Sequence, residues 1–241
     1  MDSKPYFDEI AGQWDGVRQT FFSDKVREVA LARAGVQPGL LAADIGAGTG
    51  FLTEALLQRG LRVLAVDQSP AMLEELMRRL GHPDQVECRA GESESLPVAD
   101  NAVDYVFANM YLHHVESPPS SIREMVRTLK PGGTIVITDA DEHTYEFLRT
   151  EQHDRWLGFK RDDIRRWFAD AGLKGVQVDC VGDNCCPTSR GTGERVAIGI
   201  FIAVGRKRDS RRDFPSYRTT ISSQKTHAGS PRPGCQAGSG P

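Results

Sequence analysis

The chain has 241 residues, of which 39% are hydrophobic and 26% are charged, as in an ordinary soluble globular domain. No apolar run is long enough for a membrane span, and the first residues lack the apolar stretch of a secretory signal. The five cysteines fit neither a disulfide framework nor a paired zinc site. The sequence therefore predicts a cytoplasmic protein in a reducing compartment.

Charge divides the chain into two parts. Residues 206–241 carry eight basic and two acidic side chains, whereas residues 1–205 carry 22 basic and 31 acidic ones. The acidic part disfavours nucleic-acid binding, because clustered Lys and Arg supply most of the affinity for phosphate. Ser, Gly, Pro and Arg dominate the C-terminal stretch, so we expect a domain of residues 1–206 and a disordered basic tail of residues 207–241.

The elements in chain order alternate between helix and strand. Residues to about 36 carry apolar side chains at helical spacing and predict an N-terminal helical cap. Short β-rich runs then alternate with helical patterns, which is typical of a parallel, doubly wound sheet. A Gly-, Asn- and Ser-rich stretch joins the last two runs and predicts an antiparallel hairpin. The predicted strands are 40–45, 62–66, 103–108, 134–138, 175–181 and 195–204, and the predicted helices are 51–59, 71–80, 122–129 and 162–171.

The strongest motif is a glycine-rich turn between a strand and a helix, LAADIGAGTGF. It places Asp44 at the end of the strand and glycines at 46, 48 and 50. Glycines are needed there when a ligand lies against the backbone. Phe51 stands where the dinucleotide-binding fingerprint has its third glycine, and no Gly-Lys-Ser/Thr follows to make a P-loop.

Two further acids follow at the ends of predicted strands. Asp67 lies 21 residues after Gly46, and an acid at that edge accepts hydrogen bonds from the hydroxyls of a bound ribose. Glu92 follows Gly91 and could accept a hydrogen bond from an adenine amine. The segment FANMYLHHVESP then ends the next strand, and LKPGG leads into another.

These four blocks, in this order and spacing, resemble the class I S-adenosylmethionine-dependent methyltransferases, in the small-molecule type 11 branch related to ubiquinone and menaquinone biosynthesis. The resemblance covers about residues 6–204. It implies an α/β, doubly wound Rossmann-like sheet of seven strands in the order 3-2-1-4-5-7-6, with strand 7 antiparallel. It also implies S-adenosylmethionine as the cofactor and S-adenosylhomocysteine as its product.

The resemblance also implies the cofactor contacts, because each block matches one part of the cofactor. Glu92 departs from the commoner Asp by one methylene. The implied contacts are Asp44, Gly46, Ala47, Gly48 and Gly50 on the methionine side, Asp67 at the ribose, Gln68 and Met72 beside the adenosine, Gly91, Glu92 and Ser93 at the adenine, and Asn109 beside the methionine moiety.

The acceptor side is less defined. His113 is a candidate general base or positioning residue, since histidine titrates near neutral pH. Methyl transfer from a sulfonium needs mainly in-line positioning and desolvation, so a dedicated base is optional. The candidate substrate contacts are Tyr6, Trp14, His114, His143, His153 and Trp156.

Residues 143–159 resemble a segment of methyltransferases found beside, or fused to, arsenic-repressor-like regulators. His143, Glu146, Glu151, His153 and Asp154 are either a metal cluster or a charged helix face over the active site. Their spacing matches no HExxH-type motif, so no metal site is predicted.

The sequence thus predicts an enzyme that transfers a methyl group from S-adenosylmethionine to a small molecule and releases S-adenosylhomocysteine. One alternative is an arsenic(III)-type methyltransferase, because Cys185 and Cys186 in a mobile loop, with Cys180 five residues earlier, offer soft thiolates. A second alternative is a binding module for the cofactor without turnover. A nucleic-acid methyltransferase is disfavoured by the acidic domain and by the lack of an Asn/Asp-Pro-Pro-Tyr sequence. No membrane partner is expected, and the sequence identifies neither the acceptor nor the oligomeric state.

Overall fold

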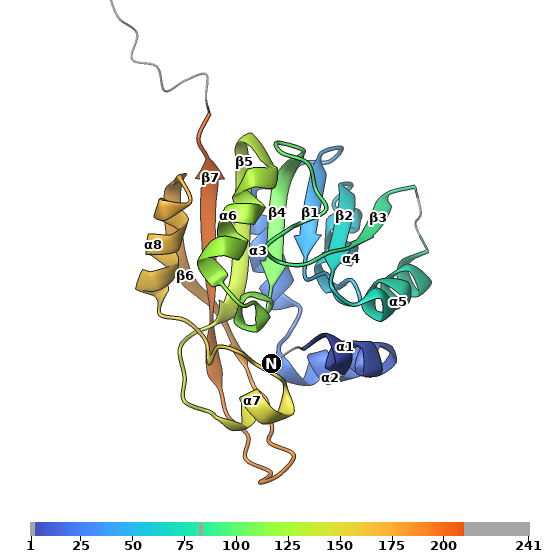
Figure 1. Cartoon of the computed structure of the whole chain (residues 1–241), viewed down its shortest axis with the longest axis vertical. Coiled ribbons are helices and arrows are strands. Elements are labelled where there is room, and N and C mark those ends of the chain that lie inside the picture. The colour runs from blue at the N-terminus through green and yellow to red at the C-terminus, as the bar shows by residue number, and fades with distance from the viewer. Residues whose placement is uncertain (1–2, 82–83, 210–241) are drawn as a thin grey trace, which may run out of the picture.

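A computed structural model describes residues 3–81 and 84–209. A seven-stranded sheet in the order β3-β2-β1-β4-β5-β7-β6 forms its centre (Figure 1). β7 is antiparallel to both neighbours, whereas the pairs among β1 to β5 are parallel. The predicted fold class, strand order and closing hairpin are therefore confirmed. The strands are β1 (Leu41–Ile45), β2 (Arg62–Asp67), β3 (Val86–Ala90), β4 (Val103–Asn109), β5 (Leu129–Ala140), β6 (Leu173–Cys185) and β7 (Ile198–Lys207).

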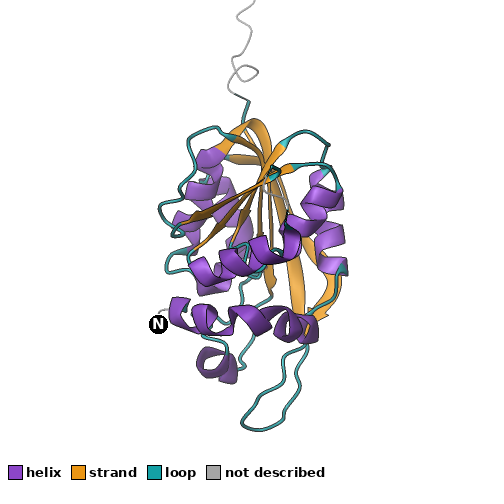
Figure 2. Ribbon diagram, turned by 90° about the vertical axis from the view of Figure 1, so that its right-hand side faces the viewer, coloured by secondary structure: helices purple, strands orange, loops and turns teal. Residues whose placement is uncertain are grey.

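Helices cover both faces of the sheet, so that the domain has three layers (Figure 2). One face packs against α3 (Lys25–Ala34), α4 (Phe51–Gln58) and α5 (Pro70–Leu80). The other face packs against α6 (Pro118–Thr128) and α8 (Arg161–Asp170). The strand side chains that meet these helices are almost all apolar and buried, which is why the two cores hold the sheet rigid beneath its carboxyl edge.

The start of α5 shows how local sequence sets an element boundary next to the site. Ser69 accepts a hydrogen bond from the backbone N–H of Met72 through its side chain, and Pro70 is the first helical residue. This capping residue and this proline both favour a helix start. Gly81 ends the helix in a left-handed conformation. The cap fixes the chain immediately after Asp67.

Short N-terminal elements lie across the carboxyl edge of the parallel strands (Figure 1). They are α1 (Lys4–Ile10), the 3-10 helix η1 (Ala11–Gln13) and α2 (Trp14–Phe21). Asp15 ties them to the glycine turn, because it accepts a hydrogen bond from Thr49 at 2.7 Å and pairs with Arg79 at 2.8 Å. Ser69 also donates to Asp8 at 2.5 Å. The N-terminal segment therefore covers the carboxyl edge of the sheet, which is where the sequence predicts the ligand.

The hairpin strands differ from their predicted bounds. β6 runs on to Cys185, and β7 begins only at Ile198. Cys185 is therefore the buried last residue of a strand, and its predicted place in a mobile loop is wrong. Gly, Asp and Asn at 182–184 suggested a loop, but the strand continues through them with a shift in register against β7.

The segment 143–159 forms only the five-residue helix α7 (Phe147–Glu151), so the predicted helix face is wrong. Left-handed backbone at His153 and Gly158 interrupts any longer helix. β3 was also absent from the predicted strands. It is an edge strand in which only Val86 is fully buried, so it lacks a long apolar run.

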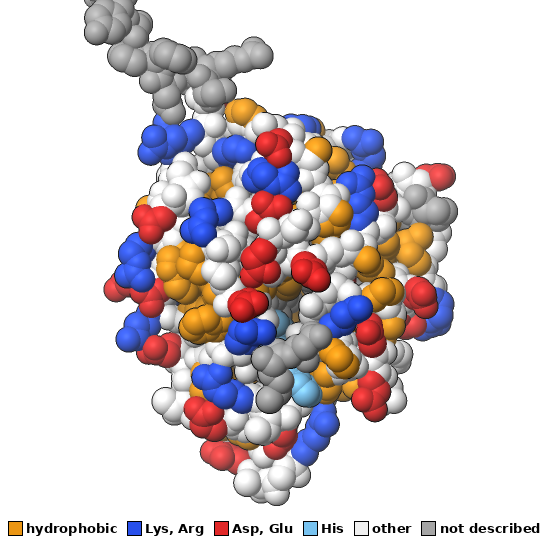
Figure 3. Space-filling view, viewed as in Figure 1, with side chains coloured by type: hydrophobic (Ala, Val, Ile, Leu, Met, Phe, Trp, Pro, Cys, Tyr) orange, Lys and Arg blue, Asp and Glu red, His pale blue; other side chains and the backbone are white. Residues whose placement is uncertain are grey.

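The predicted disordered tail lies outside the described residues, apart from 207–209, of which Lys207 ends β7. No helix among the described residues combines the length and the apolarity that crossing a membrane requires. Acidic and basic side chains alternate over the face seen in Figure 3, without a broad field of one sign. This face therefore offers no basic surface of the kind that binds nucleic acid.

Candidate functional site

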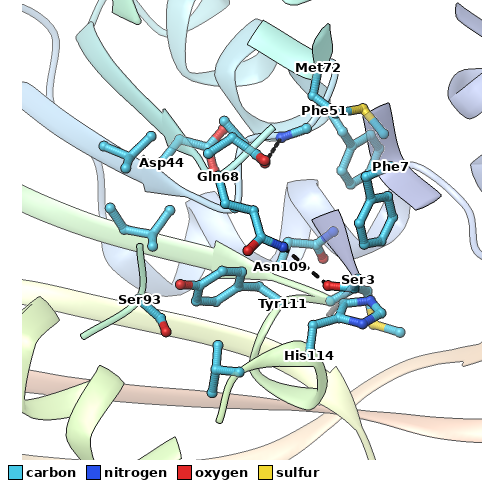
Figure 4. A pocket seen from close by; sticks show the side chains of 18 of the residues that line it. Ser3, Phe7, Asp44, Phe51, Gln68, Met72, Ser93, Asn109, Tyr111 and His114 are labelled. Atoms are coloured by element: carbon cyan, nitrogen blue, oxygen red, sulfur yellow. Dashed lines mark hydrogen bonds between the residues drawn. The ribbon is translucent and has the colours of Figure 1, made fainter. Parts of the chain in front are cut away.

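A cavity of about 330 Å³ opens at the carboxyl edge of β1, β2 and β4, beneath α1 and α2 (Figure 4). All the residues predicted to contact the cofactor line this cavity except Gly50. Gly50 instead begins α4 with a φ of 95°, and a Cβ there would meet the Leu76 side chain at 3.0 Å. A glycine is therefore needed at position 50 for the conformation of the turn and for the packing of α5, and not for contact with the ligand.

Two glycines of the turn are required for different reasons. A Cβ at Gly46 would lie 2.3 Å from the ring of Tyr111, so this glycine makes room for a protein side chain. A Cβ at Gly48 would have only the Trp14 indole within 4 Å, at 3.6 Å. Gly48 therefore presents bare backbone to the cavity, which is the arrangement that a ligand lying against the turn requires.

Asp67 couples the second strand to the glycine turn. Its Oδ2 accepts a hydrogen bond from the backbone N–H of Gly48 at 2.8 Å, and its Oδ1 accepts one from Ser69 at 2.9 Å. Each oxygen keeps a lone pair for a ligand hydroxyl. Burial raises the pKa of Asp67 above its usual value. Gln68 crosses the cavity and donates to Ser3 at 3.1 Å, as Figure 4 shows.

The remaining predicted contacts lie at two ends of the cavity. Asp44 is fully buried beneath the turn, where Thr53 donates a 2.7 Å hydrogen bond to its carboxylate. Burial raises the pKa of Asp44 to about 6. At the other end, the side chain of Glu92 is exposed at the rim beside Ser93. Asn109 lies at the end of β4 and accepts a hydrogen bond from Thr138.

Sequence reasoning missed Arg18, the cationic side chain on the inner surface of α2. It is only 8% exposed, and its guanidinium lies over the ring of Phe51 at 4.2 Å. Its Nε is buried without a hydrogen-bond partner, and no carboxylate of residues 3–81 and 84–209 forms an ion pair with it. Burial lowers its pKa. Asp15 and Asp24 act on the charge of Arg18 without forming an ion pair with it. A buried cation that forms no ion pair is costly, so its position in the cavity wall indicates an anionic ligand group.

The signal that could have found Arg18 is its spacing from Trp14. Residues four apart share one helix face. Both side chains line the cavity, with the Trp14 indole beside Gly48. Trp14 is thus a predicted contact that the structure does bring to the site.

A second, smaller cavity of about 50 Å³ adjoins the first. The two cavities share a wall, and most of the second one is apolar or aromatic. The shared residues are Phe7, Trp14, Phe22, Met110 and His114. Met110 has a φ of 48°, which is rare for a residue with a side chain and typical of strained positions at functional sites.

His113 lies buried in the wall of the second cavity between two acids. Its Nδ1 is 2.7 Å from Oδ1 of Asp139, and its Nε2 is 3.7 Å from Oδ1 of Asp154. Burial alone would lower the pKa of His113, but the two carboxylates outweigh it and raise the pKa to about 9. Burial raises the pKa of Asp154 to about 6. His113 is therefore a charged donor at neutral pH, which favours positioning over the predicted general base.

The other predicted substrate contacts separate into two groups. His114 and His143 line the second cavity. Tyr6, His153 and Trp156 line neither cavity, so the structure does not place them in the site. Tyr6 stacks on His153 with ring centroids 4.6 Å apart. Trp156 is 40% exposed and donates its indole N–H to the carbonyl of Val115.

The three cysteines of the thiophilic alternative do not converge. Cys180 is exposed, Cys186 is half-buried, and Cys185 alone lines the second cavity. Among the described residues, no group of three potential metal ligands contains a cysteine. The predicted alternative metal cluster around His143 is not assembled either. Glu151, for example, accepts hydrogen bonds from Ser189 and Arg190 instead.

Comparisons with known proteins agree with this geometry. Residues 43–137 match the model of the family described as methyltransferase domain. A demethylmenaquinone methyltransferase of Renibacterium salmoninarum is 33% identical over 158 residues, which are 62% of this chain and 65% of the relative. One of Clavibacter sepedonicus is 37% identical, over 55% of this chain and 56% of the relative.

Among solved structures, the putative methyltransferase in a Haloferax volcanii complex with the Trm112 methyltransferase activator has a TM-score of 0.69. It is 24% identical, and the match covers 84% of this chain and 97% of that one. A phosphoethanolamine methyltransferase of Haemonchus contortus has a TM-score of 0.63 at 18% identity, over 76% and 52% of the two chains. Such likenesses show a shared fold.

The fold and the glycine turn thus define a class I methyltransferase domain. Residues 43–137 match the methyltransferase domain, and the sequence is similar to demethylmenaquinone methyltransferases. It spans about two thirds or less of the length of the curated relatives it matches.

Proposed function

We propose that this chain transfers a methyl group from S-adenosylmethionine to a small-molecule acceptor and releases S-adenosylhomocysteine. The observation that carries the proposal is the cavity at the glycine turn, which offers bare backbone at Gly48, a ribose acid at Asp67 and an unpaired cation at Arg18. Together these groups match a nucleoside joined to an amino acid.

The two ends of the cavity suit the two ends of that ligand. Arg18 supplies the charge that a carboxylate needs, and Asp44 is a buried carboxylate beneath the turn that suits the ammonium of the same amino acid. Asp67 accepts from the ribose hydroxyls, and the adenine lies toward Glu92 and Ser93. The bound cofactor supplies an electrophilic methyl group on a sulfonium.

The second cavity is where we place the acceptor. Phe7, Trp14 and Met110 separate it from the first cavity, and they hold the acceptor against the methyl group while they exclude water. An acceptor held there would present its lone pair in line with the methyl group, and any proton that it loses would pass to solvent. His113 and Asp139 orient the acceptor rather than remove its proton.

The proposal is tested by incubating the full chain with methyl-labelled S-adenosylmethionine and a panel of small apolar acceptors that carry a hydroxyl, amine or nucleophilic carbon. We expect label in one acceptor class and release of an equal amount of S-adenosylhomocysteine. Tight binding of S-adenosylhomocysteine without transfer to any acceptor would instead support a binding module without turnover.

Cofactor affinity should depend on pH through Asp44. Its pKa is about 6 in the ligand-free protein because it is buried. A bound ammonium favours the carboxylate form, so ligand binding releases a proton below pH 6. Affinity for S-adenosylhomocysteine should therefore fall by up to about tenfold per pH unit below 6 and level off above it.

Calorimetric titrations between pH 5 and 7.5 measure this slope. Asp44→Asn keeps an oxygen for the Thr53 hydrogen bond and should give a shallower slope. Asp67, whose pKa burial also raises, is the nearby group that continues to titrate. Equal slopes for the wild type and Asp44→Asn would contradict the assignment of Asp44.

A further inference from the structure

Three donor groups in the wall of the second cavity converge on one point. His113, His114 and Asp154 each offer a ligand atom, and these atoms all lie within 4.8 Å of one another. They come from η2 (Leu112–His114) after β4 and from the loop after α7, which the fold brings to the same edge of the sheet. Two imidazoles and a carboxylate are a donor set that transition metals favour.

The protein satisfies these three groups only in part at the point where they meet. Nε2 of His113 and Oδ1 of Asp154 are 3.7 Å apart, beyond hydrogen-bond reach. The Asp154 side chain is only 10% exposed. Nδ1 of His114 is buried and has no hydrogen-bond partner in the part of the chain that the structure describes. Buried polar atoms are ordinarily hydrogen-bonded, so an unfilled set of this kind indicates a ligand between them.

Asp139 fixes the orientation of His113. It is fully buried, accepts hydrogen bonds from the backbone of Leu112 and Ala140, and binds Nδ1 of His113 at 2.7 Å. The opposite nitrogen, Nε2, is thereby turned toward Asp154. A carboxylate on the far nitrogen is the usual outer partner of a histidine that ligates a metal. It sets the tautomer and the ring plane before the ion arrives.

The charges around His113 also favour a cation. Asp139 and Asp154 flank the imidazole, and Arg149 also lies near enough for its charge to act on Asp154. His143 faces the same cavity and is half-buried. Both carboxylates thus lie beside the imidazole that would ligate an ion.

We propose that His113, His114 and Asp154 form a binding site for a divalent transition-metal ion, with Asp139 as the positioning residue for His113. Three protein ligands leave coordination positions open toward the second cavity, as in catalytic rather than structural metal sites. Imidazole donors favour ions of the Zn²⁺, Co²⁺ and Ni²⁺ kind over Mg²⁺ or Ca²⁺. An acceptor with an oxygen or nitrogen donor fits the open positions. The site itself stands independently of methyl transfer.

Metal binding is measured on the untagged full chain after treatment with a chelator and dialysis, without S-adenosylmethionine. Titration with Co²⁺ should produce visible d–d absorption that saturates at one ion per chain, and Zn²⁺ should displace it. Mg²⁺ should not. A spectrum that never departs from that of aqueous Co²⁺ would overturn the proposal.

Matched variants locate the ion. Asp154→Asn keeps the size of the side chain, and His114→Phe keeps the ring that packs edge-on against Phe7. Each should weaken Co²⁺ binding by about tenfold or more. His143→Ala removes a histidine from the same cavity but outside the group, and it should bind Co²⁺ like the wild type.

An unchanged circular-dichroism spectrum verifies the fold of each variant. Unchanged S-adenosylhomocysteine affinity in Asp154→Asn, which lies outside the first cavity, separates failure of the metal site from failure of the proposed function. Equal Co²⁺ affinity in the wild type, Asp154→Asn and His114→Phe would contradict the assignment. So would loss of binding in His143→Ala, because the ion would then lie elsewhere.

Discussion

Replacing Arg18 with methionine is expected to weaken S-adenosylhomocysteine binding by about 30-fold or more, while the ligand-free protein melts at the same or a higher temperature. Removing one partner of a buried charge pair costs about 2–5 kcal/mol of binding free energy, and about 1.4 kcal/mol corresponds to tenfold in affinity. The stability effect has the opposite sign, because methionine replaces a buried guanidinium that forms no ion pair among the described residues of the free protein.

The ligand itself provides a second test of Arg18. 5′-Methylthioadenosine has the nucleoside and the sulfur but no amino-acid group, so its affinity should change by no more than a few-fold in Arg18→Met. Calorimetry with both ligands on both proteins isolates the carboxylate contact as a double-mutant cycle.

Arg27→Met is the matched control. Arg27 also lies against the ring of Phe51, at 5.1 Å, but it pairs with Asp24 and Glu54 outside the cofactor cavity. This variant should lower the melting temperature and leave ligand affinity unchanged. Equal losses of affinity in the two variants would show that Arg18 acts through the packing of Phe51 and not through the ligand.

Gly48→Val is expected to abolish detectable S-adenosylhomocysteine binding, a loss of more than about 100-fold. The added side chain would extend from the turn into the cavity, where only the Trp14 indole is within 4 Å of a Cβ. It would displace the ligand from the backbone that it lies against. The backbone at Gly48 has a φ of 52°, so the substitution also strains the turn.

Gly35→Val separates strain from obstruction. Gly35 ends α3 with a φ of 62°, has open space around it and lines no part of the cofactor cavity. Its substitution should lower the melting temperature by a similar amount and leave binding intact. If Gly48→Val bound the ligand as tightly as Gly35→Val, the cavity at the turn would not be the cofactor site.

Much of this architecture follows from local patterns in the sequence. Strand and helix signals alternate from β1 to β5, and short connections leave little choice of topology once each parallel pair needs a crossover helix. Asp44, Gly48 and Asp67 were predicted from the glycine-rich motif, its spacing and the family resemblance, and the structure brings them to one cavity. Their positions follow directly from strand ends, because the carboxyl ends of parallel strands meet at one edge.

Contacts between distant segments were not predictable in the same way. Asp139 contacts His113 although the two are 26 residues apart in the sequence, and no local pattern around either residue predicts this contact. Arg18 has the sequence context of a solvated helix residue, yet the roof over the sheet buries it. The β6 bounds were missed because its end is polar, while pairing with β7 holds it as a strand. Burial and long-range pairing decide these features, and local composition does not encode them.

A crystal structure of the full chain with S-adenosylhomocysteine would show directly whether the cofactor binds in the first cavity. We expect the ribose hydroxyls at Asp67, the amino-acid carboxylate at Arg18, and the sulfur facing the wall that the two cavities share. A nucleoside bound away from Asp67, or an amino-acid group directed away from Arg18, would contradict the account. So would an empty first cavity at saturating ligand.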